Sequence, residues 1–77
     1  EFIILTPETD LNGAFIHAER LRSDIEKYQF NTAGYITSSF GVTEFNSETD
    51  DIEKLLDRAD KALYLAKENG RNRVEKV

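Results

Sequence analysis

The apolar residues in the first third of the chain recur at intervals of three and four. They are Leu11, Ala14, Phe15, Ala18, Leu21, Ile25 and Tyr28. This spacing predicts an amphipathic helix that buries one face, and either Thr9 or Asp10 is suited to cap its N-terminus. Before it, Phe2–Leu5 is a short apolar run that ends at Thr6-Pro7, which favours a buried strand terminated by proline.

Hydrophobic and polar residues alternate between positions 35 and 45. Ile36, Phe40 and Val42 fall on one face of the extended chain, whereas Gly41 and several polar residues fall on the other. The alternation predicts a strand with one buried face. Ser38 interrupts the apolar face, so its hydroxyl would need a hydrogen-bond partner if it is buried.

A second apolar stripe predicts a helix in the last third of the chain. It consists of Ile52, Leu55, Leu56, Ala59, Leu63 and Ala66. Ser47 and Asp50 have the spacing of a capping box before this helix, and Gly70 suits the left-handed residue that follows a helix end. Residues 73–77 are compatible with a final edge strand. The order strand, helix, strand, helix, strand predicts an α+β fold, with residues 1–77 forming one small domain or a portion of one.

The composition narrows the classes of function. The net charge is −5, which disfavours a nucleic-acid binder because such a protein needs a basic face. The longest run of aliphatic and aromatic residues is Phe2–Leu5, far shorter than the ~20 residues of a membrane-spanning helix. The chain has no cysteine, which fits a reducing compartment, and we expect a cytoplasmic protein.

The chain contains no methionine, not even at its first position. We therefore expect it to be a segment of a longer protein. A domain of this size buries only about 60% of the surface of its unfolded chain, so its stability should be marginal.

Motifs in order along the chain resemble the GGDEF domain, the catalytic module of diguanylate cyclases. Glu1-Phe2 matches the last two letters of the motif that names the family, and Ile3–Leu5 resembles the strand that leaves this hairpin. Residues 18–22 look like part of the family's next helix, and residues 36–42 are similar to its T-x-S-x-G-V strand. The family's closing signature is matched by Arg58–Tyr64, Ala66-Lys67 and Gly70–Asn72.

The resemblance implies a nucleotidyl-cyclase or palm-like domain, in which helices flank a mostly antiparallel sheet. It implies a diguanylate cyclase that condenses two GTP molecules into cyclic di-GMP and pyrophosphate with Mg²⁺ or Mn²⁺, as a homodimer of domains. Only the C-terminal half would be present, without the two glycines and the acidic residue that precede Glu1. The family's first strand would lie between Phe2–Leu5 and residues 36–42. We therefore expect the 77 residues alone to be inactive, and marginally stable or paired with strands of another copy.

The resemblance also assigns roles to single residues. Glu1 would lie at the metal and catalytic end of the hairpin, and the alternative is a solvated terminal glutamate. Lys67 and Arg71 would contact the phosphates of GTP, although cations at a helix C-terminus also complement the helix dipole and cap its last carbonyls. Arg20 matches a position that contacts the product at an inhibitory site in some members, whereas most exposed helix arginines are only solvated.

Two alternative functions stay open at this point. The domain could have lost catalysis and sense GTP or cyclic di-GMP, or it could be a structural or oligomerising fragment. An intact Gly-Gly-acidic triplet before Glu1 would favour catalysis, and a GTP titration would separate a binding domain from a structural one.

Overall fold

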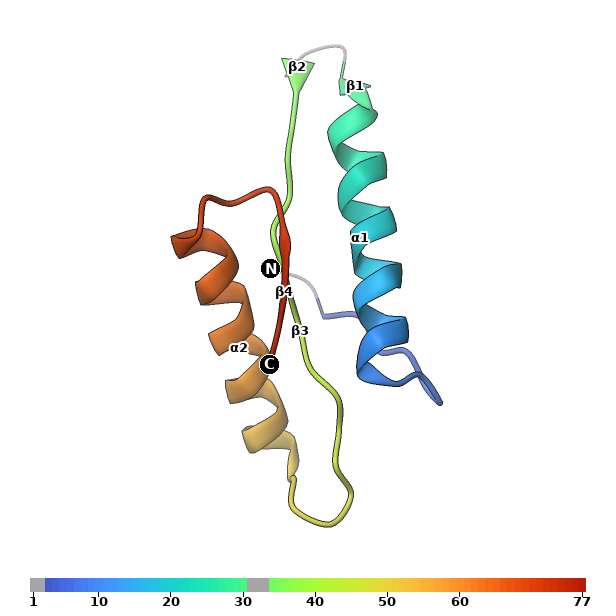
Figure 1. Ribbon diagram of the computed structural model, residues 1–77, viewed down its shortest axis with the longest axis vertical. Coiled ribbons are helices and arrows are strands. Elements are labelled where there is room, and N and C mark those ends of the chain that lie inside the picture. Colours follow the sequence, from blue (N-terminus) through green and yellow to red (C-terminus); the bar gives the residue numbers. More distant parts are fainter. Residues whose placement is uncertain (1–2, 31–33) are drawn as a thin grey trace.

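The computed structural model describes residues 3–30 and 34–77, and it has two long helices beside short paired strands (Figure 1). The elements are α1 (Leu11–Lys27), β1 (Gln29–Phe30), β2 (Gly34–Tyr35), β3 (Phe40–Val42), α2 (Ile52–Glu68) and β4 (Val74–Lys76). The α+β class predicted from the sequence is therefore confirmed. Neither of the described helices is long and apolar enough to cross a membrane.

Both helices begin at an aspartate whose side chain accepts a hydrogen bond from the first turn. Asp10 Oδ1 accepts from the backbone N–H of Gly13 at 2.7 Å, and Asp51 Oδ1 accepts from that of Lys54 at 2.9 Å. Each carboxylate satisfies an N–H group that has no partner within the helix. Asp10 was one of the two residues predicted for the first helix.

The predicted capping box of Ser47 and Asp50 is wrong. The Asp50 carboxylate accepts a hydrogen bond from the backbone N–H of Asn46 at 2.8 Å. It therefore closes the loop in front of α2, and the neighbouring Asp51 takes the capping position. Sequence spacing could not choose between adjacent aspartates that both suit a helix start.

The strands β3 and β4 pair in parallel, with Phe40 opposite Val74 and Val42 opposite Lys76. The chain passes through α2 between them, because parallel neighbours need a long crossover connection. A second pair, β1 with β2, is antiparallel and only two residues long. The longer ladder in the described residues is thus parallel, in place of the mostly antiparallel sheet that the sequence led us to expect.

The strand expected at Phe2–Leu5 is not formed by residues 3–5, and Phe2 lies outside the described residues. No ladder pairs residues 3–5 with the rest of the described chain, and Ile3 and Leu5 are 71% and 76% exposed. An apolar run becomes a strand only when another strand accepts its backbone hydrogen bonds. The strand expected between residues 35 and 45 is likewise reduced to β2 and β3.

The helices α1 and α2 cover opposite faces of the β3–β4 pair (Figure 1). On the α1 face, Val42 and Val74 form a small buried core with Ala18. Gly41, one residue earlier in β3, faces α2, because successive residues of a strand point to opposite faces. The sheet is therefore the layer that fixes the two helices relative to each other.

Gly41 brings the backbone of β3 directly against the backbone of α2. A Cβ atom at this position would lie 2.2 Å from the nitrogen of Leu63 and 2.5 Å from the carbonyl oxygen of Ala59. The fully buried side chains of α2 are also small, since they belong to Ala62 and Ala66. Any larger residue at position 41 would push the strand off the helix.

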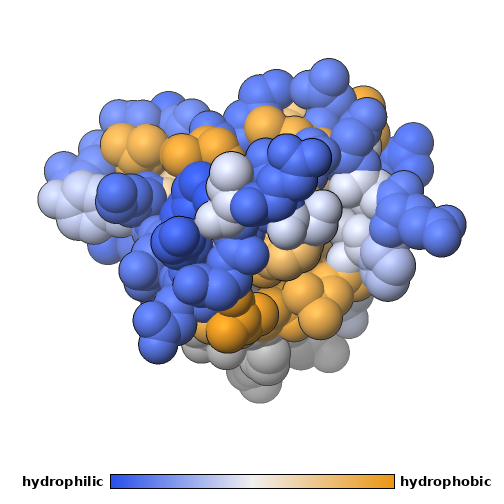
Figure 2. Space-filling view, turned by 90° about the horizontal axis from the view of Figure 1, so that it is seen from below, coloured by the Kyte–Doolittle hydropathy of each residue, from blue (hydrophilic) through white to orange (hydrophobic). Residues whose placement is uncertain are grey.

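Much apolar surface is uncovered in the described part of the chain. Ile4, Ile52 and Tyr64 are 59%, 63% and 63% exposed, and Figure 2, which views the end that holds the start of α1, shows apolar surface among the hydrophilic residues.

The hydroxyl oxygen of Ser38 is buried and has no hydrogen-bond partner among the described residues, which destabilises the fold. The hydrogen-bond partner that the sequence pattern required for a buried Ser38 is therefore not supplied by the described residues.

We predict that Gly41→Ala lowers the free energy of unfolding by about 1–3 kcal/mol or more, because the new methyl group meets the rigid backbone of α2. Gly13→Ala is the matched control. At position 13 the added Cβ would lie 3.0 Å from the side-chain methyl group of Thr9 and 3.2 Å from Asp10 Oδ1. Both atoms belong to side chains and not to the backbone, so the change should stay within about 1 kcal/mol. Urea denaturation of both variants tests this, and equal stabilities would contradict the backbone contact.

Candidate functional site

The turn between α2 and β4 has three consecutive residues with positive φ angles. They are Gly70 at 122°, Arg71 at 61° and Asn72 at 49°. Glycine adopts such angles freely and asparagine tolerates them. For an arginine the left-handed conformation costs of the order of 1–3 kcal/mol and persists only where the surroundings impose it. The turn is therefore a strained segment at the end of the second helix, and Gly70 fills the position predicted for it.

Backbone hydrogen bonds hold the first part of this turn. The N–H group of Asn69 donates to the carbonyl oxygen of Leu65 at 2.8 Å, and that of Arg71 donates to the carbonyl oxygen of Ala66 at 2.8 Å. These bonds satisfy carbonyl groups that the helix end would otherwise leave free. The end of α2 is thus capped by the backbone of the turn.

Asn72 ties the turn to the rest of the fold. Its backbone N–H donates to Ser39 Oγ at 3.1 Å, on the chain that leads into β3. Its side chain is held by α1, because Arg22 Nη1 donates to Asn72 Oδ1 at 2.8 Å and Asn72 Nδ2 donates to Glu26. Residues almost 50 positions apart in sequence therefore meet at this turn.

Arg22 is itself fixed between two carboxylates of α1. Its guanidinium bonds Glu19 at 2.6 Å and Glu26 at 3.3 Å, one turn to either side, and its side chain is only 15% exposed. The hydrogen bonds from Arg22 lower the pKa of Glu19, and those from Asn72 and Arg22 lower the pKa of Glu26. The pKa of Arg22 is raised, first of all by Glu19. All three groups are therefore charged at neutral pH.

Lys67 and Arg71, the two predicted phosphate ligands, are both exposed near the end of α2. Neither side chain forms a hydrogen bond or an ion pair with another described residue. Since backbone groups cap the helix, these side chains are not used to cap its last carbonyls, which was one of the alternative interpretations. Two cations four residues apart are thus left facing solvent at one end of the helix.

The other predicted site residues lie elsewhere. Arg20 is exposed on α1, and its side chain forms no hydrogen bond or ion pair within the described chain. Glu1 lies outside the described residues. No group of three histidine, aspartate or glutamate side chains among residues 3–30 and 34–77 could hold a metal ion. The described part of the chain therefore places Lys67 and Arg71 near the same end of α2, and does not supply a metal site.

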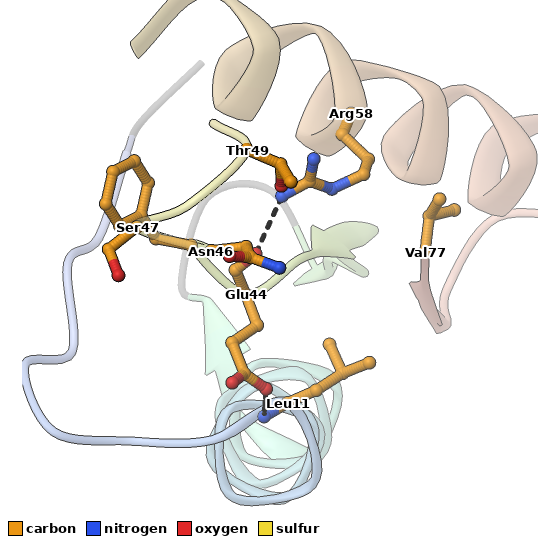
Figure 3. Close-up of a pocket in the computed structure, with 8 residues that line it drawn as sticks. Leu11, Glu44, Asn46, Ser47, Thr49, Arg58 and Val77 are labelled. Carbon is orange, nitrogen blue, oxygen red and sulfur yellow. Dashed lines mark hydrogen bonds between the residues drawn. The ribbon is translucent and has the colours of Figure 1, made fainter. Parts of the chain in front are cut away.

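A second polar cluster lies at the opposite end of the molecule, beside an open hollow of about 490 Å³ (Figure 3). Arg58 of α2 is its centre. Its Nε donates to Thr43 Oγ1 at 2.6 Å, its Nη1 and Nη2 donate to the two carboxylate oxygens of Asp50 at 2.8 and 2.7 Å, and Nη2 also donates to the carbonyl oxygen of Glu44 at 2.7 Å.

This cluster fixes the loop between β3 and α2. Glu44 extends it to α1, because its carboxylate accepts a hydrogen bond from the backbone N–H of Leu11 at 2.8 Å, as Figure 3 shows. Arg58 uses four of its five N–H donor positions within the protein, so it has little capacity left for a ligand. We assign the cluster to folding.

The sequence interpretation missed both arginine clusters. The spacing of Glu19, Arg22 and Glu26, three and four residues apart, is the usual signal for ion pairs along a helix and could have revealed the first part of one cluster. The bond from Arg22 to Asn72 and the loop partners of Arg58 have no local signal, since they depend on how the elements pack.

Comparison with known proteins gives a consistent result. The family described as "Diguanylate cyclase, GGDEF domain" matches residues 1–73. Diguanylate cyclase A of Treponema denticola is 39% identical over 77 residues, which cover 96% of this chain and 21% of that protein. Diguanylate cyclase DosC of Escherichia coli is 43% identical over 79 residues, covering 97% of this chain and 17% of that protein.

Diguanylate cyclase VdcA of Vibrio cholerae is 44% identical over 80 residues, covering 96% of this chain and 23% of that protein. The chain thus spans about a fifth of the length of the curated relatives it matches. No solved structure matches it.

We predict that acid weakens the fold through Asp50. The hydrogen bonds from Arg58 lower the pKa of this carboxyl to about 2. Because the folded-state pKa lies below the unfolded value of about 3.9, the carboxylate stabilises the fold above about pH 4 and loses this effect as the pH falls towards 2. Asp50→Asn should therefore lower the Tm at pH 7, and the difference from the parent should shrink as the pH approaches 2.

The control is Asp57→Asn, because Asp57 is exposed on α2 and its side chain forms no hydrogen bond within the described chain. Its Tm difference from the parent should be small at both pH values. A difference for Asp50→Asn that is the same at pH 7 and at the acid end would contradict the assignment of the ion pair.

Proposed function

The chain belongs to the GGDEF domain family of diguanylate cyclases, and on this premise we propose that it is part of a domain that condenses two GTP molecules into cyclic di-GMP and pyrophosphate. The observation that carries the proposal is the pair of cations at the end of α2. Lys67 and Arg71 are exposed and unpaired within the described chain. Arg22 and Arg58, in contrast, are held by carboxylates.

A triphosphate suits this pair for a physical reason. The C-terminal end of a helix carries a partial negative charge, so its dipole repels an anion. A phosphate could bind there only through side-chain cations that outweigh this field. A guanidinium offers a planar fork that matches two phosphate oxygens, and an ammonium adds a compact charge. We assign Arg71 the forked contact and Lys67 the point contact.

In the proposed reaction, each of two domains holds one GTP, and the 3′-hydroxyl of each nucleotide attacks the α-phosphate of the other with loss of pyrophosphate. The domains would therefore act as a homodimer. The role of Lys67 and Arg71 is to hold the phosphates in position and to neutralise their charge, which is the main contribution that proteins make to phosphoryl transfer.

The family's divalent metal does not fit the described residues, which contain no suitable group of ligands. We propose Glu1, which lies outside them, as a ligand for Mg²⁺ or Mn²⁺ and as part of the catalytic end of the hairpin. The metal would neutralise phosphate charge. We further propose that Arg20, exposed on α1, takes part in an inhibitory site for cyclic di-GMP.

We predict that Arg71→Ala, made in the protein that carries this chain, weakens the binding of 3′-deoxy-GTP by about 1.5–3 kcal/mol, the value of hydrogen bonds to charged groups. The Tm should hardly move. Arg71→Lys should also bind poorly, because an ammonium cannot form the forked contact. Calorimetric titration and thermal melts measure both quantities. Unaltered affinity with a lowered Tm would instead show that Arg71 only stabilises the helix end.

We predict that the full-length protein converts GTP to cyclic di-GMP in the presence of Mg²⁺, and that the 77 residues alone do not, because Glu1 is their one proposed metal ligand and residues 3–30 and 34–77 contain no group of side chains that could hold a metal ion. Chromatography of the nucleotides measures the product. Arg71→Ala should reduce turnover by at least tenfold, which corresponds to about 1.4 kcal/mol. Lys61→Ala, which removes another exposed cation of α2, should not.

The outcome also separates the alternatives. Binding of GTP without turnover would identify a sensing domain, and absence of both would identify a structural or oligomerising role. Turnover by the 77 residues alone would contradict the proposed division of the site.

A further inference from the structure

We infer that Arg22 is a positioning residue for Arg71, and that it acts through Asn72. The inference rests on the proposed function, because it concerns how the phosphate contact of Arg71 is aimed. Arg22 lies on α1, in a different element from the cations at the end of α2. It would therefore act on the site without touching the nucleotide.

The direction of the Arg71 side chain depends on its backbone. The side chain itself has no hydrogen bond or ion pair within the described chain, so no neighbour orients it. Its backbone is held at both ends, since its N–H donates to the carbonyl oxygen of Ala66 at 2.8 Å and its own carbonyl accepts from Arg73 Nε at 3.3 Å. The φ angle of 61° then sets the direction in which the side chain leaves the backbone, and so the region that the guanidinium can reach.

This backbone conformation needs an external restraint. Arg71 and Asn72 both have left-handed φ angles, and such angles relax unless the surrounding structure imposes them. Three hydrogen bonds reach Asn72 from outside the turn, one through Ser39 and two through the side chains of Arg22 and Glu26. Two of the three therefore come from α1.

Arg22 is suited to be the restraint because its guanidinium is bound by carboxylates on both sides. Glu19 and Glu26 form ion pairs with its guanidinium, and the shortest contact is 2.6 Å between Arg22 Nη2 and Glu19 Oε1. A planar guanidinium loses little conformational freedom on forming each further bond. The donor that it offers to Asn72 is thus fixed in direction. Through its hydrogen bonds to Asn72, α1 holds the turn in a defined position, and the backbone of the turn determines where Arg71 lies.

The test is a double-mutant cycle in the full-length protein, with 3′-deoxy-GTP as the probe. Arg22→Lys keeps the charge but loses the fork. It should weaken binding roughly five- to tenfold, because a misplaced contact loses much of its value. In the Arg71→Ala background the same change should alter binding by less than roughly twofold, since coupled residues are not additive. A merely structural role would lower the Tm equally in both backgrounds and leave binding additive.

Two further variants sharpen the cycle. Asn72→Gly keeps the left-handed backbone accessible and removes only the side-chain tether, so it should reproduce the loss of affinity even if Arg22→Lys proves unstable. Lys27→Ala is the matched control, because Lys27 is an exposed cation of α1 whose side chain forms no hydrogen bond within the described chain. It should bind the probe like the parent.

The outcomes separate the inference from the proposed function. Unchanged affinity in Arg71→Ala would refute the phosphate role and the inference together. Weakened binding in Arg71→Ala, with parent-like binding in both Arg22→Lys and Asn72→Gly, would refute the positioning role alone. Additive losses in the cycle would also overturn it.

Discussion

The backbones of β3 and α2 lie in direct contact at Gly41, and this contact holds the second helix against the sheet. A Cβ atom at that position would lie 2.2 Å from the backbone of the helix. The buried residues of the helix are correspondingly small, since they are Ala62 and Ala66. The contact sets how closely α2 packs against β3. Beyond the end of this helix the chain turns to reach β4, the parallel partner of β3.

The turn that results is the place where both helices meet the candidate site. α2 supplies the two exposed cations, and α1 supplies the hydrogen bonds that hold Asn72. The opposite end of the molecule is organised differently, because Arg58 is occupied by Asp50 and by the loop before α2. The chain thus uses similar arginines for two purposes. Arg22 and Arg58, which are bound by carboxylates, stabilise the fold, and Arg71, which has no such partner in the described chain, is the arginine that we propose as a phosphate ligand.

Sequence patterns predicted the elements that depend on local periodicity. The two helices, the cap at Asp10 and the left-handed Gly70 follow from spacing and from the chemistry of single residues. The expected strand at Phe2–Leu5 was wrong over residues 3–5, because strand formation depends on a partner that no local pattern reveals. The parallel pairing and the bond from Arg22 to Asn72 were missed for the same reason. The cations Lys67 and Arg71 were found only through the family resemblance, since helix-end cations alone are equally typical of dipole effects.

We propose that the nucleotide binds at the turn after α2 and not at the hollow beside Arg58. Titration of the ¹⁵N-labelled full-length protein with 3′-deoxy-GTP and Mg²⁺, followed by amide chemical shifts, distinguishes these two places. We expect that, within this chain, the largest shifts fall on residues 67–73 and that the amides of residues 44–50 hardly move. Shifts concentrated on residues 44–50, with residues 67–73 unchanged, would contradict it.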